Sequence, residues 1–358
     1  MKACSPRGPL SHRLVSTLGS EPFRVEGLRD LAEDVVAASR FIVDDEDVQL
    51  SLYLLYELHY GGLEGVDDRW EWSPQLLEAR AVLEARFEQD LRAEFSWADP
   101  EPALEDLPSV LFQLAAPSSS PSGGGVASYV AREATLEQVA ELLALRSVYQ
   151  LKEGDPQTWT IPRLSGPAKA ALVEIQMDEY GGGRFERMHS QLFARCLRSV
   201  GMSEEPNRYL EHVPAVTLAS VNAMSLFGLH RRLRGASCGL LAAFEMTSSL
   251  PCRRYVSGLQ RLGLGENATE FFDEHVEADA VHEQVAAHDL CGGLARQEPG
   301  LVDDVLLGAA VCLGLDARSG DRVLAAWSRG RSALRKPLEL DASSPRANAG
   351  LGRPHAVA

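Results

Sequence analysis

The sequence of 358 residues contains no long uninterrupted apolar run. The closest, from Val213 to Leu229, is short, includes Ser, Thr and Asn, and is followed by three arginines. Because a membrane-spanning helix needs about 20 mostly apolar residues, we expect none. The first residues also lack the apolar segment of a secretory signal. The sequence therefore predicts a soluble protein of the cytoplasm that does not act at a membrane.

Paired cysteines and excess positive charge are lacking as well. The six cysteines form no CxxC pair, which in so long a chain is typical of reduced thiols and not of a disulfide framework. Lys and Arg number 35 against 51 Asp and Glu, a net charge of −16. Nucleic acids and anionic membrane surfaces are bound by cationic side chains, so we expect neither as a partner. The 45% of hydrophobic residues is ordinary for a globular protein.

Strand patterns are absent, and helical patterns take their place. No segment alternates apolar and polar residues convincingly, whereas apolar residues recur every three or four positions. Thr135 followed by Gln138 has the pattern of a capping box at a helix start. The sequence predicts an all-α protein, with helices at 75–97, 135–149, 213–233, 239–246, 270–290 and 302–315.

Composition also divides the chain. Ser, Gly and Pro dominate the middle of residues 115–128, which predicts a linker. Before it we expect a flexible N-terminus at 1–20 and an accessory helical region at 21–114. After it we expect the main helical domain at 129–336 and a disordered tail at 337–358, which is poor in large apolar residues.

The segment FFDEHVEADAVHEQVAAH (271–288) carries the clearest chemical pattern. It places His275, Asp279 and His282 in an HxxxDxxH array, which on a helix projects all three side chains within about 60° of one another. Two imidazoles and a carboxylate suit a first-row transition metal, and a carboxylate-rich set favours iron or manganese over structural zinc. A solvated acidic helix is the alternative. His288 points about 120° away from His282 and is predicted to be a surface or packing residue.

A second pattern surrounds three consecutive glycines in VEIQMDEYGGGRFERMHSQLFARCL (173–197). Glu186 and His189 have the ExxH spacing that ferritin-like di-iron bundles use twice, but the chain has no second ExxH. A different carboxylate-rich helical site is therefore expected. The glycines are costly within a helical pattern, so they indicate a bulge or a close approach of substrate or metal to the backbone. A packing role for His189 stays open.

Two further carboxylates lie at predicted helix ends. Glu245 lies at the end of an apolar helix of small residues and leucines. If its carboxylate is buried, it must be paired or bound to a cation, and the alternative is that it faces water. Glu153 is explained equally well by an ordinary helix end. Glu57 and His59 are two residues apart and point to different faces of a helix, so we interpret them as structural.

These motifs together resemble the haem-oxygenase-like di-iron oxidases and oxygenases, also described as iron-containing redox enzymes. The resemblance rests on DEYGGGRFERMH, FEMT and HVEADAVH, and it covers residues 135–290. It implies a haem-oxygenase-like helical bundle with additional N-terminal helices. Glu153 matches an additional carboxylate of the nitrogen-oxygenating branch. The implied ligands of two iron ions are Glu179 and His189 on one core helix, Glu245 on a later helix, and His275, Asp279 and His282 on the last.

The resemblance also implies an activity. The expected enzyme is an oxidoreductase that activates O2 at two iron ions through a peroxo-di-iron(III) intermediate. Its expected substrate is a small amine or amino-acid-like molecule, which undergoes N-oxygenation, desaturation or oxidative C–C cleavage. An external electron donor and a homodimer formed through the N-terminal helices are further expectations. Tyr180 and Arg184, beside the glycines, are candidate substrate-binding residues, and Arg187 is a second cation that could hold a substrate carboxylate.

Two other classes stay open. A metal-free, thiaminase-like enzyme of the same architecture would need a nucleophilic cysteine, for which Cys196 and Cys238 are the candidates. A non-catalytic helical interaction protein would tolerate alanine at the HxxxDxxH positions without losing a bound metal.

Overall fold

The structure, a computed structural model, describes residues 4–22, 25–95, 102–116 and 125–338. These ranges contain α-helices, short 3₁₀ turns and no strand, which confirms the predicted all-α class. None of their helices combines the length and apolar character of a membrane span. The α-helices are α1 (Pro9–Leu18), α2 (Leu28–Ala38), α3 (Glu46–Glu57), α4 (Pro74–Glu94), α5 (Leu107–Ala115), α6 (Gly125–Arg132), α7 (Leu136–Gln150), α8 (Asp155–Thr158), α9 (Gly166–Glu179), α10 (His189–Ser199), α11 (Ala215–Leu229), α12 (Arg234–Arg261), α13 (Glu266–Gln284), α14 (Gly292–Gln297) and α15 (Val302–Trp327).

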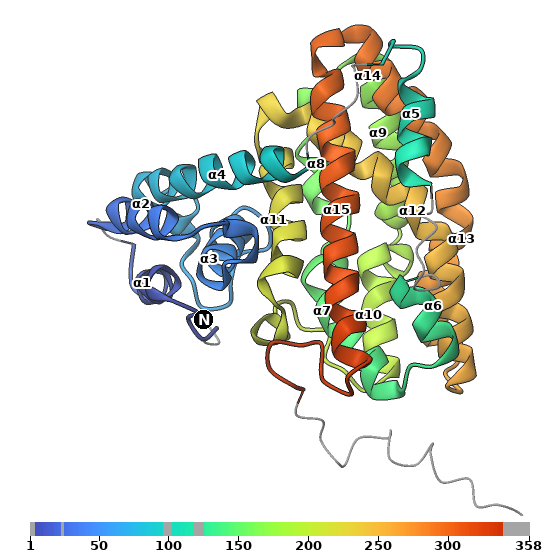
Figure 1. Cartoon of the computed structure of the whole chain (residues 1–358), viewed down its shortest axis with the longest axis horizontal. Coiled ribbons are helices and arrows are strands. Elements are labelled where there is room, and N and C mark those ends of the chain that lie inside the picture. The colour runs from blue at the N-terminus through green and yellow to red at the C-terminus, as the bar shows by residue number, and fades with distance from the viewer. Residues whose placement is uncertain (1–3, 23–24, 96–101, 117–124, 339–358) are drawn as a thin grey trace, which may run out of the picture.

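Figure 1 shows an upright bundle around α12 and α15, with α1, α2 and α3 to one side and α4 extending from them toward α15. Two glycines explain how closely α12 and α15 pack. A Cβ added to Gly239 of α12 would lie 1.9 Å from the carbonyl oxygen of Val305, and one added to Gly308 of α15 would lie 1.9 Å from that of Ala236. The two backbones therefore touch directly, which buries α12 in the centre of the bundle.

Several predicted helices are present with different ends. Thr135 caps α7 as expected, because its hydroxyl accepts from the backbone N–H of Gln138 while the Gln138 side chain accepts from the Thr135 N–H. The helix predicted at 239–246 is part of the 28-residue α12, which continues through Pro251. The helix predicted at 270–290 begins earlier and changes at Val285 into a π-helical segment that ends at Cys291.

The three glycines interrupt the helix, which corrects the expectation of one continuous helix with a bulge. α9 ends at Glu179, two 3₁₀ turns follow, and α10 begins at His189. Gly181, Gly182 and Gly183 all have positive φ angles (60°, 61° and 77°), a conformation that residues with a side chain rarely adopt. Glu179 and His189 consequently lie on two helices and not on one.

The boundaries predicted from composition need correction in three places. Residues 9–18 of the expected flexible N-terminus form α1, whose Leu10, Leu14 and Leu18 are buried. α5, expected in the accessory region, packs on the bundle. The last residues of the expected linker, 125–128, begin α6. Residues 117–124 of the linker and 339–358 of the tail lie outside the described residues. The buried apolar side chains of α1–α4 are continuous with those of the bundle.

Candidate metal centre

The seven predicted ligand residues come from five places in the fold and are all buried. Each exposes at most 8% of its surface. This burial excludes a solvated acidic helix as the explanation of the HxxxDxxH array. The residues are Glu153 in the turn after α7, Glu179 at the end of α9, His189 at the start of α10, Glu245 within α12, and His275, Asp279 and His282 on α13.

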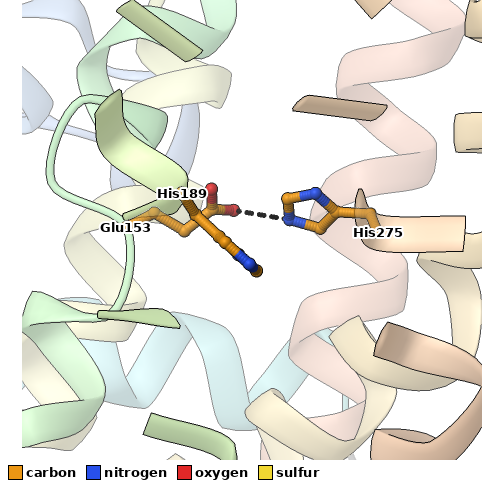
Figure 2. Close-up of side chains that lie close together, drawn as sticks. All are labelled: Glu153, His189 and His275. Atoms are coloured by element: carbon orange, nitrogen blue, oxygen red, sulfur yellow. Dashed lines mark ion pairs between the residues drawn. The ribbon is translucent and has the colours of Figure 1, made fainter. Parts of the chain in front are cut away.

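Three of these residues form a first ligand group. One ligand atom from each of Glu153, His189 and His275 lies within 4.8 Å of the others. Figure 2 shows Glu153 and His275 facing each other, with His275 Nε2 3.5 Å from Glu153 Oε1. The ring centroids of His189 and His275 are 4.5 Å apart. His275 donates Nδ1–H to the carbonyl of Phe271 at 2.7 Å, which directs Nε2 into the group, as is usual for metal-binding histidines.

Glu245, Asp279 and His282 form a second ligand group, with ligand atoms again within 4.8 Å of one another. Here the histidine has the opposite orientation. His282 donates Nε2–H to Asp178 Oδ2 at 2.9 Å, and its Nδ1 lies 3.5 Å from Glu245 Oε2. The Ser248 hydroxyl donates to the Asp279 carboxylate. His282 therefore presents Nδ1 to this group, while Asp178 fixes the ring from outside.

Glu179 connects the two groups. Its Oε2 lies 3.2 Å from His189 Nδ1. It also lines a cavity of about 10 Å³ together with Glu153 and His275 of the first group and Glu245 and Asp279 of the second. Residues of both groups thus line one small cavity, and the Glu179 carboxylate lines it with them.

Several ligand atoms are buried without a hydrogen-bond partner in the described part of the chain. They are Glu153 Oε2, Glu179 Oε2, both ring nitrogens of His189, and His282 Nδ1. Leaving a buried polar atom unpaired costs about 1–3 kcal/mol, so a histidine that only packs would hydrogen-bond at least one ring nitrogen. One cation bound in each group would give these atoms partners. The donor set of nitrogen and carboxylate oxygen also suits iron, so these residues fit the metal that the family resemblance implies.

In the second group, the pKa values of two ligand residues are raised. Burial, reinforced by the neighbouring Glu245, raises the pKa of Asp279 to about 9. Burial opposes protonation of His282, but the charge of the nearby Glu245 and the hydrogen bond to Asp178 prevail and raise the pKa of that imidazole to about 9. The group by itself therefore holds protons at neutral pH.

The first group and Glu179 show the same competition. Burial raises the pKa of Glu153, although His275 opposes that shift. Burial also disfavours the charged forms of His275 and Glu179, but their neighbours outweigh it. Glu153 holds the pKa of His275 well above its ordinary value, and the histidines, His189 first, hold the pKa of Glu179 below its ordinary value. In this part of the site, attraction between imidazoles and carboxylates thus opposes the effect of burial.

The predicted substrate-binding residues lie outside the cavity lining. The Tyr180 hydroxyl is 2.8 Å from Asp155 Oδ1 and 2.8 Å from Thr158 Oγ1. Arg184 is exposed, and Arg187 pairs with Glu274 at 3.5 Å. The lining includes instead Tyr149, Gln157 and Gln176, which the sequence patterns did not single out. For Gln176 a signal was available, since it precedes Glu179 by three residues on the same helix and shares its face.

The structure also shows where the glutamate of the ExxH motif and the two candidate cysteine nucleophiles lie. Glu186 is exposed in the 3₁₀ turn before α10 and belongs to neither ligand group. Cys196 and Cys238 are buried, and burial raises the pKa of each thiol to about 12. A nucleophilic cysteine requires a lowered pKa, so these environments disfavour the thiaminase-like alternative.

Comparison with known proteins assigns the class. Residues 140–317 match the model of the family described as iron-containing redox enzymes, and this segment contains all seven buried ligand candidates. The chain belongs to this family, is an oxidoreductase by that membership, and has the haem-oxygenase-like all-α fold.

One individual protein is also similar to part of the chain. The chain is similar to nitrosourea synthase from Streptomyces achromogenes subsp. streptozoticus, with 28% identity over 160 residues. The alignment covers 44% of this chain and 34% of that protein, so the chain spans about a third of the length of this relative.

Proposed function

We propose that this protein is a non-haem di-iron oxygenase that binds one iron ion in each ligand group and oxygenates a nitrogen atom of a small amine or amino-acid-like substrate. The observation that carries the proposal is the pair of buried ligand groups around one cavity, with ring nitrogens and carboxylate oxygens left unpartnered. The chemistry that iron supplies when bound is the two-electron reduction of O2.

The choice of nitrogen oxygenation rests on the relative. A nitrosourea contains an oxidised nitrogen, which supports N-oxygenation over desaturation or oxidative C–C cleavage. Because the alignment covers only a third of that protein, the proposal concerns the oxygenation step alone. Turnover would require an external electron donor to restore the ferrous state.

The residues of the chain have defined tasks in this proposal. Glu153, His189 and His275 would hold one ion and Glu245, Asp279 and His282 the other, and Glu179 would supply a further carboxylate. Leu241 and Phe244 of α12 add apolar surface to the lining of the cavity. The cavity of about 10 Å³ has room for a molecule the size of water, so an amino-acid-sized substrate would bind beside it or require an opening of the site.

The experiment compares the wild-type protein with Asp279→Ala and with Asp273→Ala, which removes an exposed carboxylate of the same helix. Each protein is loaded anaerobically with Fe(II), desalted, assayed for iron, and mixed rapidly with O2 in the presence of a panel of amino acids and amines. We expect two iron ions and a transient visible absorption in the wild type and in Asp273→Ala. Asp279→Ala should keep one ion and show no transient.

The amine or amino acid that accelerates decay of the transient would identify the substrate, and mass spectrometry would show whether oxygen was added to nitrogen. Retention of both ions and of the transient by Asp279→Ala would overturn the assignment of the second group.

A further inference from the structure

The turn that carries Glu153 is in contact with the N-terminal helices. Glu153 lies between α7 and α8, outside any helix, so helix geometry does not fix its side chain. The preceding residue, Lys152, forms an ion pair with Glu57, the last residue of α3. The side chains of Lys152 and Glu57 are only 12% and 6% exposed. A buried ion pair thus joins α3 directly to the residue next to a proposed iron ligand.

The surroundings of this ion pair restrict it to one geometry. The Lys152 ammonium lies 4.8 Å from the ring centre of Tyr53 and 4.6 Å from that of Tyr60. Asn207 donates to the second carboxylate oxygen of Glu57 at 3.2 Å, and the Tyr53 hydroxyl donates to the Asn207 side chain at 2.6 Å. Buried charges that lose a partner are strongly disfavoured, so the lysine is held where Glu57 lies.

The other side of the turn is fixed by α9. The carbonyl oxygen of Gly154 accepts from Gln176 Nε2 at 2.7 Å. Gly154 has a φ of +89°, and a Cβ at this position would lie 3.1 Å from Cβ of Glu179. Glu153 is therefore clamped between a contact to the core of the bundle on one side and a contact to the N-terminal helices on the other.

We propose that Glu57 and Lys152 are positioning residues through which the N-terminal helices hold Glu153 in the first ligand group. This inference rests on the proposed iron site and gives the N-terminal helices a part in it. Glu153 Oε1 is 3.5 Å from His275 Nε2, and metal–ligand distances tolerate changes of only about 0.2 Å. A small displacement of the turn thus removes a ligand, whereas the second group on α12 and α13 is unaffected. Glu57, interpreted from the sequence as structural, acquires a functional role.

The test uses Lys152→Met, Glu57→Gln and the double variant of the full chain. Cobalt(II) is titrated anaerobically, with its visible absorption and the bound equivalents as readouts. We expect one of the two ions to bind about 10–100-fold more weakly in each variant, as for other residues that orient metal ligands, while the second ion binds as in the wild type. The double variant should be no weaker than either single variant, because both remove the same interaction.

Arg92→Met is the matched control. It breaks another ion pair between the N-terminal helices and the bundle, from Arg92 of α4 to Asp304 of α15 at 2.8 Å, and it should leave both ions bound. The inference is overturned if Lys152→Met and Glu57→Gln bind both ions with wild-type affinity, or if Arg92→Met loses the same ion. A wild-type chain that binds no metal would overturn the proposed function itself, and the inference with it.

Discussion

At the scale of single residues, the two histidines of the HxxxDxxH array present different ring nitrogens to their ligand groups. His275 gives its Nδ1–H to the carbonyl of Phe271 one turn earlier on its own helix, so a local contact orients it. His282 gives its Nε2–H to Asp178, which lies on α9. The spacing in the sequence predicts that both imidazoles share a face, but the nitrogen each one offers depends on its partner.

Asp178→Ala should weaken metal binding by the second group about 10–100-fold, because His282 loses the acceptor that fixes its ring. The measurement is cobalt(II) titration followed by visible absorption. Glu174→Gln, which neutralises another exposed carboxylate one turn earlier on α9, should change nothing. Equal affinities in wild type and Asp178→Ala would show that His282 is oriented without Asp178.

The buried thiols give a second prediction at this scale. Because burial raises the pKa of Cys196 and of Cys238 to about 12, almost no thiolate is present at pH 8. Iodoacetamide should label neither residue in the folded protein within minutes, and both should react after denaturation. Mass spectrometry of the labelled peptides is the measurement. Rapid labelling of either residue in the folded protein would restore the thiaminase-like alternative.

At the scale of secondary structure, the sequence predicted where helices lie better than where they end. Capping is local, so Thr135 and Gln138 identified the start of α7 correctly. The break between α9 and α10 is not local in the same way. In the turn between these helices, the backbone at Gly181 packs closely against the backbone at Arg187. A Cβ at Gly181 would lie only 2.5 Å from the carbonyl carbon of Arg187, so this turn requires glycine. The break places Glu179 at the end of α9 and His189 at the start of α10, where Glu179 Oε2 lies 3.2 Å from His189 Nδ1.

Gly308→Ala tests the contact between α12 and α15. The new Cβ would collide with the Ala236 carbonyl oxygen, so the helices must separate, and we expect a loss of stability of about 1–3 kcal/mol or more. Gly320→Ala in the same helix is the control, because its Cβ would meet Val126 at an ordinary 3.6 Å. There the gain in helix propensity should stabilise the protein by up to about 1 kcal/mol. Urea unfolding measures both, and equal effects would refute the close backbone contact.

At the scale of the whole molecule, the N-terminal helices and the bundle share a continuous apolar core. The cavity of the candidate metal centre is lined by Tyr149 of that core and by Leu241 of a second apolar cluster. Composition suggested separate regions because the Ser/Gly/Pro-rich stretch stands between them. Composition does not report which faces pack together, and here α1–α4 bury their apolar side chains against the bundle.

Since the proposed ions bind the folded chain only, they should stabilise it. At a free metal concentration 100 times the dissociation constant, binding adds about 2.7 kcal/mol, which should raise the melting temperature by several degrees. Calorimetry with and without cobalt(II) under anaerobic conditions measures this. His189→Ala should reduce the shift, because it removes a ligand whose ring nitrogens have no hydrogen-bond partner in the described structure. A shift of equal size in His189→Ala would contradict the first ligand group.

The sequence by itself determined the all-α class and the triad of His275, Asp279 and His282, because helix periodicity and the HxxxDxxH spacing are local properties. The other four candidates came from the resemblance to a family. Only the tertiary structure decided that six of these residues divide into two groups and that Glu179 lines the same cavity. It also decided that Asp178 accepts from His282 and that Lys152 pairs with Glu57. Those relations join helices that are far apart in the sequence. They follow from which faces pack together, and burial then leaves the ring nitrogens and carboxylates with each other as their nearest partners.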